Sequence, residues 1–221
     1  MKLEEYHIKE LYRIIKKNGV KYYDVQTELV DHFAIAMEGE NTVSFEEKTK
    51  EILEGFDGKK GLKQITSQKK KVLLRKFFRI YTDGLKNYFS FPKVLLTICI
   101  FIGFVVTFQT FEVEQSTYSL IAQLLNISLI FQGSYNTNRY LKKMYNKGYS
   151  FLTIKILEYL QMIMVIPIAS LFAITTFFKE YDNVLVLSSI ITFSVVTILA
   201  YAKLKKHLVN EVISSYPMVK A

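Results

Sequence analysis

Four long apolar runs fill most of the second half of this 221-residue chain and constrain its fold more than any other feature. They are Val94–Phe111, about Thr117–Tyr135, about Ile156–Phe178 and Val184–Ala202. A helix needs roughly 20 mainly apolar residues to cross the ~30 Å hydrocarbon core of a bilayer. Runs of this length with short connections exceed what a soluble protein of this size can bury. We therefore predict an all-α membrane protein with a four-helix transmembrane bundle over residues 94–202.

Lys and Arg in the connections predict the orientation of the spans. The stretch before the first run is strongly basic, and the connection after the second run carries five bases and no acid: Arg139, Lys142, Lys143, Lys147 and Lys155. The other two connections carry one base, Lys179, and several acids. The positive-inside rule then places both termini in the cytoplasm, with residues 203–221 as a cytoplasmic tail. Because the chain has no Trp, tyrosines such as Tyr201 are expected at the membrane interfaces.

Residues 1–66 predict a compact cytoplasmic domain of three helices. Apolar residues recur at helical spacing from Ile8 to Ile15, which indicates the first helix. A second is expected over about 22–38, with a solvated acidic face made of Asp24, Glu28 and Asp31. Ser44-Phe45-Glu46-Glu47 is a capping box and predicts the start of a third helix.

Residues 67–93 predict a basic amphipathic helix that starts near Lys69 and leads into the first span. Its apolar face carries Leu74, Phe78, Tyr81, Leu85 and Tyr88. The basic residues expected to contact anionic lipid headgroups are Lys69, Lys70, Lys71, Arg75, Lys76 and Arg79. The pattern fits either a passive connector or a helix that senses lipid.

Charge is divided sharply along the cytoplasmic half. Residues 24–57 hold ten acids and two bases, whereas residues 58–93 hold eleven bases and one acid. The net charge of +9 is therefore concentrated beside the membrane, and with no nucleic-acid motif present we expect no nucleic-acid partner. The acidic stretch is expected to face the cytosol and to offer a protein partner the residues Glu28, Asp31, His32, Glu46, Glu47 and Glu54.

No motif for catalysis, a cofactor or a metal is present. Glu28 and His32 share a helix face, but this spacing fits a surface pair better than a metal site. Glu158 is the one candidate for an intramembrane functional group, and Lys155 one turn earlier can neutralise it. We therefore expect a protein that is not an enzyme and needs no cofactor.

Part of the cytoplasmic half resembles a known family. Glu28-Leu29-Val30-Asp31-His32, the Ser44 capping box and Gly55-Phe56-Asp57, with Leu62 and Ile65 beyond, are similar over residues 20–66 to the bacterial permease-prefix or HAAS-type domain. Lys48 stands where that pattern usually has Ala. Such domains typically precede transmembrane helices.

Together with the four predicted spans, the resemblance implies a multi-pass protein of the bacterial cytoplasmic membrane. It also implies a regulatory or scaffolding role, with a regulator or a transporter subunit as the protein partner. The alternative is a small subunit of a transporter or channel complex, and a homo-oligomer is compatible with either function.

Overall fold

The structure is a computed structural model that describes residues 3–38, 44–111, 120, 124, 127, 148–163 and 184–216. All regular elements among these residues are helices, as the sequence predicts. The chain divides into two compact units. The first unit is Met1–Arg75 with Met144–Ile156, and the second is Lys76–Lys143 with Leu157–Ala221.

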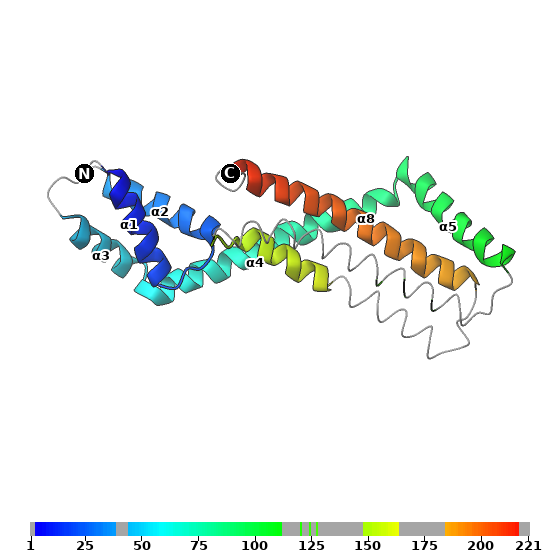
Figure 1. The fold of residues 1–221 in the computed structure, drawn as a ribbon, viewed down its shortest axis with the longest axis horizontal. Coiled ribbons are helices and arrows are strands. Elements are labelled where there is room, and N and C mark those ends of the chain that lie inside the picture. The colour runs from blue at the N-terminus through cyan, green and yellow to red at the C-terminus, as the bar shows by residue number, and fades with distance from the viewer. Residues whose placement is uncertain are drawn as a thin grey trace. The chain divides into compact units, whose positions relative to one another are not determined.

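In the first unit, α1 (Glu5–Lys17), α2 (Tyr23–Met37) and α3 (Phe45–Gly55) lie together (Figure 1). Helix α2 packs against both α1 and α3. The Phe33 ring stacks on Phe56, with 5.5 Å between ring centroids. The core of these helices contains Leu11, Ile15, Val25, Leu29, Val30 and Met37.

The predicted capping box at Ser44 is confirmed. Ser44 Oγ accepts a hydrogen bond from the Glu47 backbone N–H at 3.3 Å. Glu47 Oε2 in turn accepts one from the Ser44 N–H at 3.4 Å. Two backbone donors that the first turn of a helix leaves free are therefore satisfied at the start of α3.

Helix α4 (Gly58–Tyr88) begins at Gly58 rather than near Lys69, so the expected boundary at residue 66 lies inside a continuous helix. A tight turn joins it to α3, with left-handed φ angles of 58° at Asp57 and 54° at Gly58. At Gly61 an added Cβ would overlap the carbonyl oxygen of Phe56. A glycine is therefore required where α4 starts against the end of α3.

The buried face of α4 departs from the predicted apolar face at Phe78. Tyr81, expected on that face, is buried together with Phe77, whereas Phe78 is half exposed.

In the second unit, α5 (Lys93–Thr110) packs against α8 (Val184–Ser215). Ile191 of α8 contacts Phe104 and Phe108 of α5. In the described part of the chain, these two helices are long and apolar enough to cross a membrane. They coincide with the first and fourth predicted spans.

Helix α8 extends beyond the predicted end of the fourth span at residue 202. Leu204, Leu208 and Val212 are buried and four residues apart, so they continue the buried stripe of the helix. Residues 203–215, expected as a tail, are therefore helical.

The other two predicted spans lie largely outside the described residues. In the second, Leu120, Leu124 and Ile127 are described and helical. The third is described within a helix over residues 152–163.

Gly61→Ala should destabilise the first unit by about 1–3 kcal/mol, because the added methyl group overlaps a backbone atom that cannot move independently. Thermal unfolding of the full-length protein in detergent measures the effect. Gly55→Ala is the matched control, since nothing lies within 4 Å of its Cβ position. Equal stability of the two variants would contradict the close approach of α4 to Phe56.

Candidate functional site

A side chain in the first turn of α2, that of Asp24, accepts hydrogen bonds from the N-terminus of the helix over residues 152–163. Asp24 is buried, and its Oδ1 accepts hydrogen bonds from the backbone N–H groups of Val25 at 3.1 Å and Leu152 at 3.0 Å. Its Oδ2 accepts from the backbone N–H and the hydroxyl of Thr153, both at 3.2 Å. Leu152 and Thr153 begin the helix over 152–163, so their N–H groups have no partner within that helix. Asp24 therefore caps a helix that lies 128 residues further along the chain.

Aromatic side chains surround this contact. The Tyr23 backbone N–H donates to the Ser150 carbonyl oxygen at 2.7 Å. The Tyr23 ring lies 4.8 Å from that of Tyr149, 5.9 Å from Phe151 and 5.4 Å from Tyr12. Burial, together with hydrogen bonding to Tyr12, raises the pKa of Tyr23 to about 12. We call Tyr23, Asp24 and residues 149–153 the Asp24 joint.

The prediction that Asp24 lies on a solvated face is wrong. Helical periodicity places Asp24 on the same side of α2 as Glu28, but the first turn of α2 is covered by residues 150–153. A signal of this does exist in the sequence. Phe151 precedes the helix over 152–163 and has no side-chain oxygen that could cap this helix. The first N–H groups of the helix therefore require an acceptor from another part of the chain.

Glu28 and Lys69, predicted for a partner surface and for lipid contact respectively, form an ion pair with each other. The pair joins α2 to α4 within the first unit. The Glu28 side chain is 50% exposed and that of Lys69 is 26% exposed. Burial lowers the pKa of Lys69, and the charge of Asp24 opposes that shift.

The other predicted partner residues lie on two helices. Asp31 and His32 are exposed on α2, and Glu46, Glu47 and Glu54 are exposed on α3. Glu47 is engaged in the capping box, and Glu54 lies 4.0 Å from Lys50.

The other predicted lipid-contacting residues are exposed along α4. Lys76 pairs with Glu211 of α8 at 3.7 Å, and Arg79 lies 3.9 Å from Asp83. Lys70, Lys71 and Arg75 are exposed.

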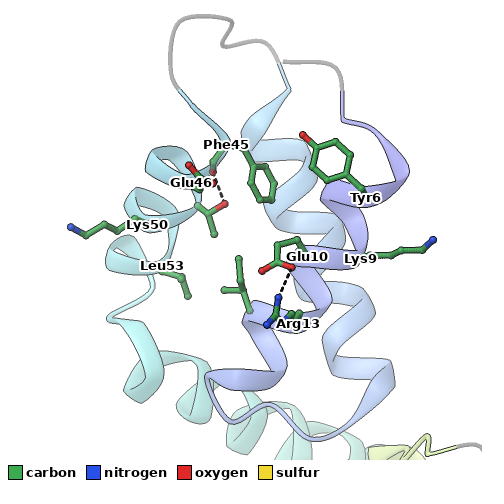
Figure 2. A pocket seen from close by; sticks show the side chains of 10 residues that line it. Tyr6, Lys9, Glu10, Arg13, Phe45, Glu46, Lys50 and Leu53 are labelled. Atoms are coloured by element: carbon green, nitrogen blue, oxygen red, sulfur yellow. Dashed lines mark hydrogen bonds and ion pairs between the residues drawn. The ribbon is translucent and has the colours of Figure 1, made fainter.

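A groove with a volume of about 730 Å³ lies between α1 and α3. Figure 2 shows the side chains that line it. Phe45 and Leu53 point into it, while Lys9 and Lys50 point away from it on opposite sides. Glu10 and Arg13 form an ion pair at 3.5 Å along the α1 edge. We call this the α1–α3 groove; its lining residues are Tyr6, Lys9, Glu10, Arg13, Ile14, Phe45, Glu46, Thr49, Lys50 and Leu53.

Glu158 is half-buried on the helix over 152–163. The same helix contacts α8 through the buried Tyr201, which the sequence placed at a membrane interface. The Tyr201 hydroxyl lies 3.2 Å from both the Leu157 carbonyl oxygen and Gln161 Oε1. Since the hydroxyl has one proton, it donates to one of these oxygens at a time.

Comparisons with protein-family models, curated proteins and solved structures found no match to the chain.

A double-mutant cycle of Glu28→Gln and Lys69→Gln should give a coupling energy of about 0.5–1 kcal/mol, because the pair is half-exposed. Urea unfolding of the full-length protein in detergent provides the four stabilities. The matched control is the more exposed Arg79–Asp83 pair, for which we expect a coupling near zero. A Glu28–Lys69 coupling no larger than the control would contradict the pairing of α2 with α4.

Proposed function

We propose that the chain is a multi-pass protein of the bacterial cytoplasmic membrane, with four spans and both termini inside. Its role is regulatory or scaffolding rather than enzymatic, and its helical N-terminal unit binds a protein partner. The observation that carries the partner-binding role is the open α1–α3 groove.

Helix α5 gives the strongest support for membrane insertion. Thr97 is its one buried residue. Its large exposed side chains include Leu95, Leu96, Ile98, Ile102 and Val106. Exposed apolar surface is unfavourable in water by roughly 25 cal/mol per Å² and favourable against lipid.

Reporter fusions test the four-span topology. Alkaline phosphatase fused after Glu114 or Asp182 should be active, because these positions follow the first and third predicted spans. A fluorescent protein that folds only in the cytoplasm should be bright after Lys147. A cytoplasmic signal at Glu114 would contradict four spans, since the first span would then not cross.

The α1–α3 groove fits a helix of a protein partner. Helix α2 packs against both α1 and α3 on one side, and the groove remains open between those two helices. Its apolar residues are spaced along both edges, Tyr6 and Ile14 on α1 and Phe45 and Leu53 on α3. Such spacing accepts the apolar face of an amphipathic helix.

Charges of both signs lie on each edge of the groove. Lys9, Glu10 and Arg13 line the α1 edge, and Glu46 and Lys50 line the α3 edge. These charges therefore do not select the charge of a partner helix. Its apolar anchors would supply most of the binding energy.

The bilayer is the second proposed partner. Lys70, Lys71 and Arg75 are exposed on α4 in the first unit, and anionic headgroups attract such residues by about 1 kcal/mol each.

A photoreactive residue at Leu53 tests partner binding in cells that express the full chain. We expect a discrete cross-linked adduct that Tyr6→Ala weakens, because Tyr6 supplies exposed apolar surface to the groove. The control is the same probe at Ile35, which is 68% exposed on α2 and outside the groove. No adduct at Leu53, or the same adduct at Ile35, would contradict the site. An adduct with a second copy of the chain would show that the groove binds another copy of this protein, which would contradict a different protein as the partner.

A further inference from the structure

Two lysine side chains of α4 reach the turn between α1 and α2, which brings basic residues from two separate parts of the chain together. Gly19 in that turn has a φ angle of 95°. A Cβ added to it would lie 3.5 Å from Lys63 Cε and 3.7 Å from Lys59 Cε. Further lysines flank the turn itself. Five exposed lysines of the first unit, which we call the Gly19 lysine patch, therefore lie at this turn: Lys16, Lys17, Lys21, Lys59 and Lys63.

The sequence places no acid within either of the two segments that form the patch. The chain carries no acid between Arg13 and Tyr23, and none from Gly58 to Thr82. Asp57, directly before α4, is the nearest acid in the sequence. None of the five lysines forms an ion pair within the part of the chain that the structure describes. The patch is therefore a surface of uncompensated positive charge.

The C-terminus of α1 does not account for these lysines. A helix C-terminus attracts cations because its last carbonyl groups lack partners, but its partial charge is only about half an elementary charge. Here other groups of the same turn already satisfy two of those carbonyls. The Ile14 oxygen accepts from the backbone N–H of Asn18 at 3.0 Å and from its side-chain amide at 2.9 Å. The Ile15 oxygen accepts from the Val20 N–H at 3.3 Å.

The residue types in the patch favour an extended anionic surface over a single small anion. All five are lysines, whose ammonium groups are compact charges on flexible stems. A site that orients one phosphate or carboxylate commonly uses the planar, bidentate fork of arginine instead. A bilayer with anionic headgroups is an extended surface that attracts lysines through charge alone.

The patch also continues toward a residue already proposed to contact lipid. Lys59, Lys63 and Lys70 of α4 follow the spacing i, i+4, i+11, which places them on one side of the helix. Lys70 is exposed and belongs to the first unit, as the patch does. One anionic surface can therefore contact the patch and Lys70 together.

We propose that the Gly19 lysine patch is a further contact of the first unit with the anionic surface of the bilayer. The α1–α2 turn and the start of α4 then bind headgroups, whereas the charge pattern of the sequence predicted lipid contacts only from Lys69 onward. This inference rests on the proposed membrane insertion. It does not depend on the number of spans, on their orientation or on any protein partner.

Acetylation of lysines in the full-length protein, followed residue by residue with mass spectrometry, tests this contact in lipid nanodiscs. Discs of phosphatidylcholine alone are compared with discs that also contain phosphatidylglycerol. We expect the five lysines of the patch to react about five-fold more slowly in the anionic discs, which corresponds to an attraction of about 1 kcal/mol per lysine. Equal rates in the two kinds of disc would overturn the proposal.

Lys9 and Lys50 are internal controls in the same experiment. Both are exposed lysines of the first unit, and each has a carboxylate nearby, Glu5 at 2.7 Å and Glu54 at 4.0 Å respectively. Their rates should be the same in both kinds of disc. Slower reaction of these two lysines by the same factor would contradict a contact made by the patch, because the anionic discs would then slow every lysine.

Variants of α4 test whether charge makes the contact. Lys59→Gln combined with Lys63→Gln should reduce the protection of the three lysines at the α1–α2 turn. Lys59→Arg combined with Lys63→Arg keeps the charge and should preserve that protection. Salt at 1 M, where the Debye length is about 3 Å, should abolish it. Protection that survives this salt concentration would contradict a contact made through charge.

A soluble phosphate compound is the competing ligand. Tripolyphosphate added to phosphatidylcholine discs should protect the patch less than phosphatidylglycerol does. Protection by tripolyphosphate without protection by phosphatidylglycerol would overturn the lipid contact. A chain that does not enter nanodiscs would contradict membrane insertion and this contact with it, whereas an inserted chain with unprotected lysines would contradict the contact alone.

Discussion

A helix that begins without its own cap must find acceptors for its first N–H groups, and this requirement organises the first unit. The helix over 152–163 follows Phe151, which offers no side-chain oxygen. Asp24 supplies the acceptors from the first turn of α2. Because α2 also packs against α1 and α3, one carboxylate fixes residues 150–153 on the three-helix cluster. The unit therefore combines the N-terminal region with a segment from far along the chain.

A different constraint determines the second unit, namely which apolar surface is buried between helices and which is left exposed. Helix α5 uses a narrow face, including Phe104 and Phe108, to pack against Ile191 of α8. Elsewhere α5 exposes large apolar side chains, among them Leu95, Leu96, Ile98, Ile102 and Val106. In water this would be an aggregation surface, but in lipid it costs nothing, and helix pairing then depends on close packing rather than on hydrophobic burial.

Local signals predicted the elements well, and long-range contacts account for the differences. Periodicity and the Ser44 capping box gave α1, α2 and α3, and apolar length gave α5 and the start of α8. The sequence did not predict the start of α4, because a glycine such as Gly61 normally disfavours a helix. Here glycine is the residue type that fits, since any Cβ would overlap the carbonyl oxygen of Phe56.

The role of Asp24 was missed because helical periodicity describes one helix at a time and carries no information about contacts with another helix. Of the candidate partner and lipid residues, Glu28 and Lys69 could not be paired from spacing alone, since they lie on different helices with α3 and the turn at Asp57 and Gly58 between them.

Acidic and basic residues are separated along the sequence, but Glu28 of the acidic stretch and Lys69 of the basic stretch form an ion pair in the structure. An ion pair at a half-exposed position is worth at most about 1 kcal/mol, which is close to the attraction of one Lys to an anionic surface. Lys69, held by Glu28, would therefore gain little by exchanging that carboxylate for a headgroup. Lys71 and Arg75 are exposed and form no ion pair among the described residues, so they can bind headgroups without losing a partner. Glu28 thus holds the acidic α2 to Lys69 in the first half of α4. In the proposed topology, anionic lipid would bind the residues just beyond Lys69 most readily.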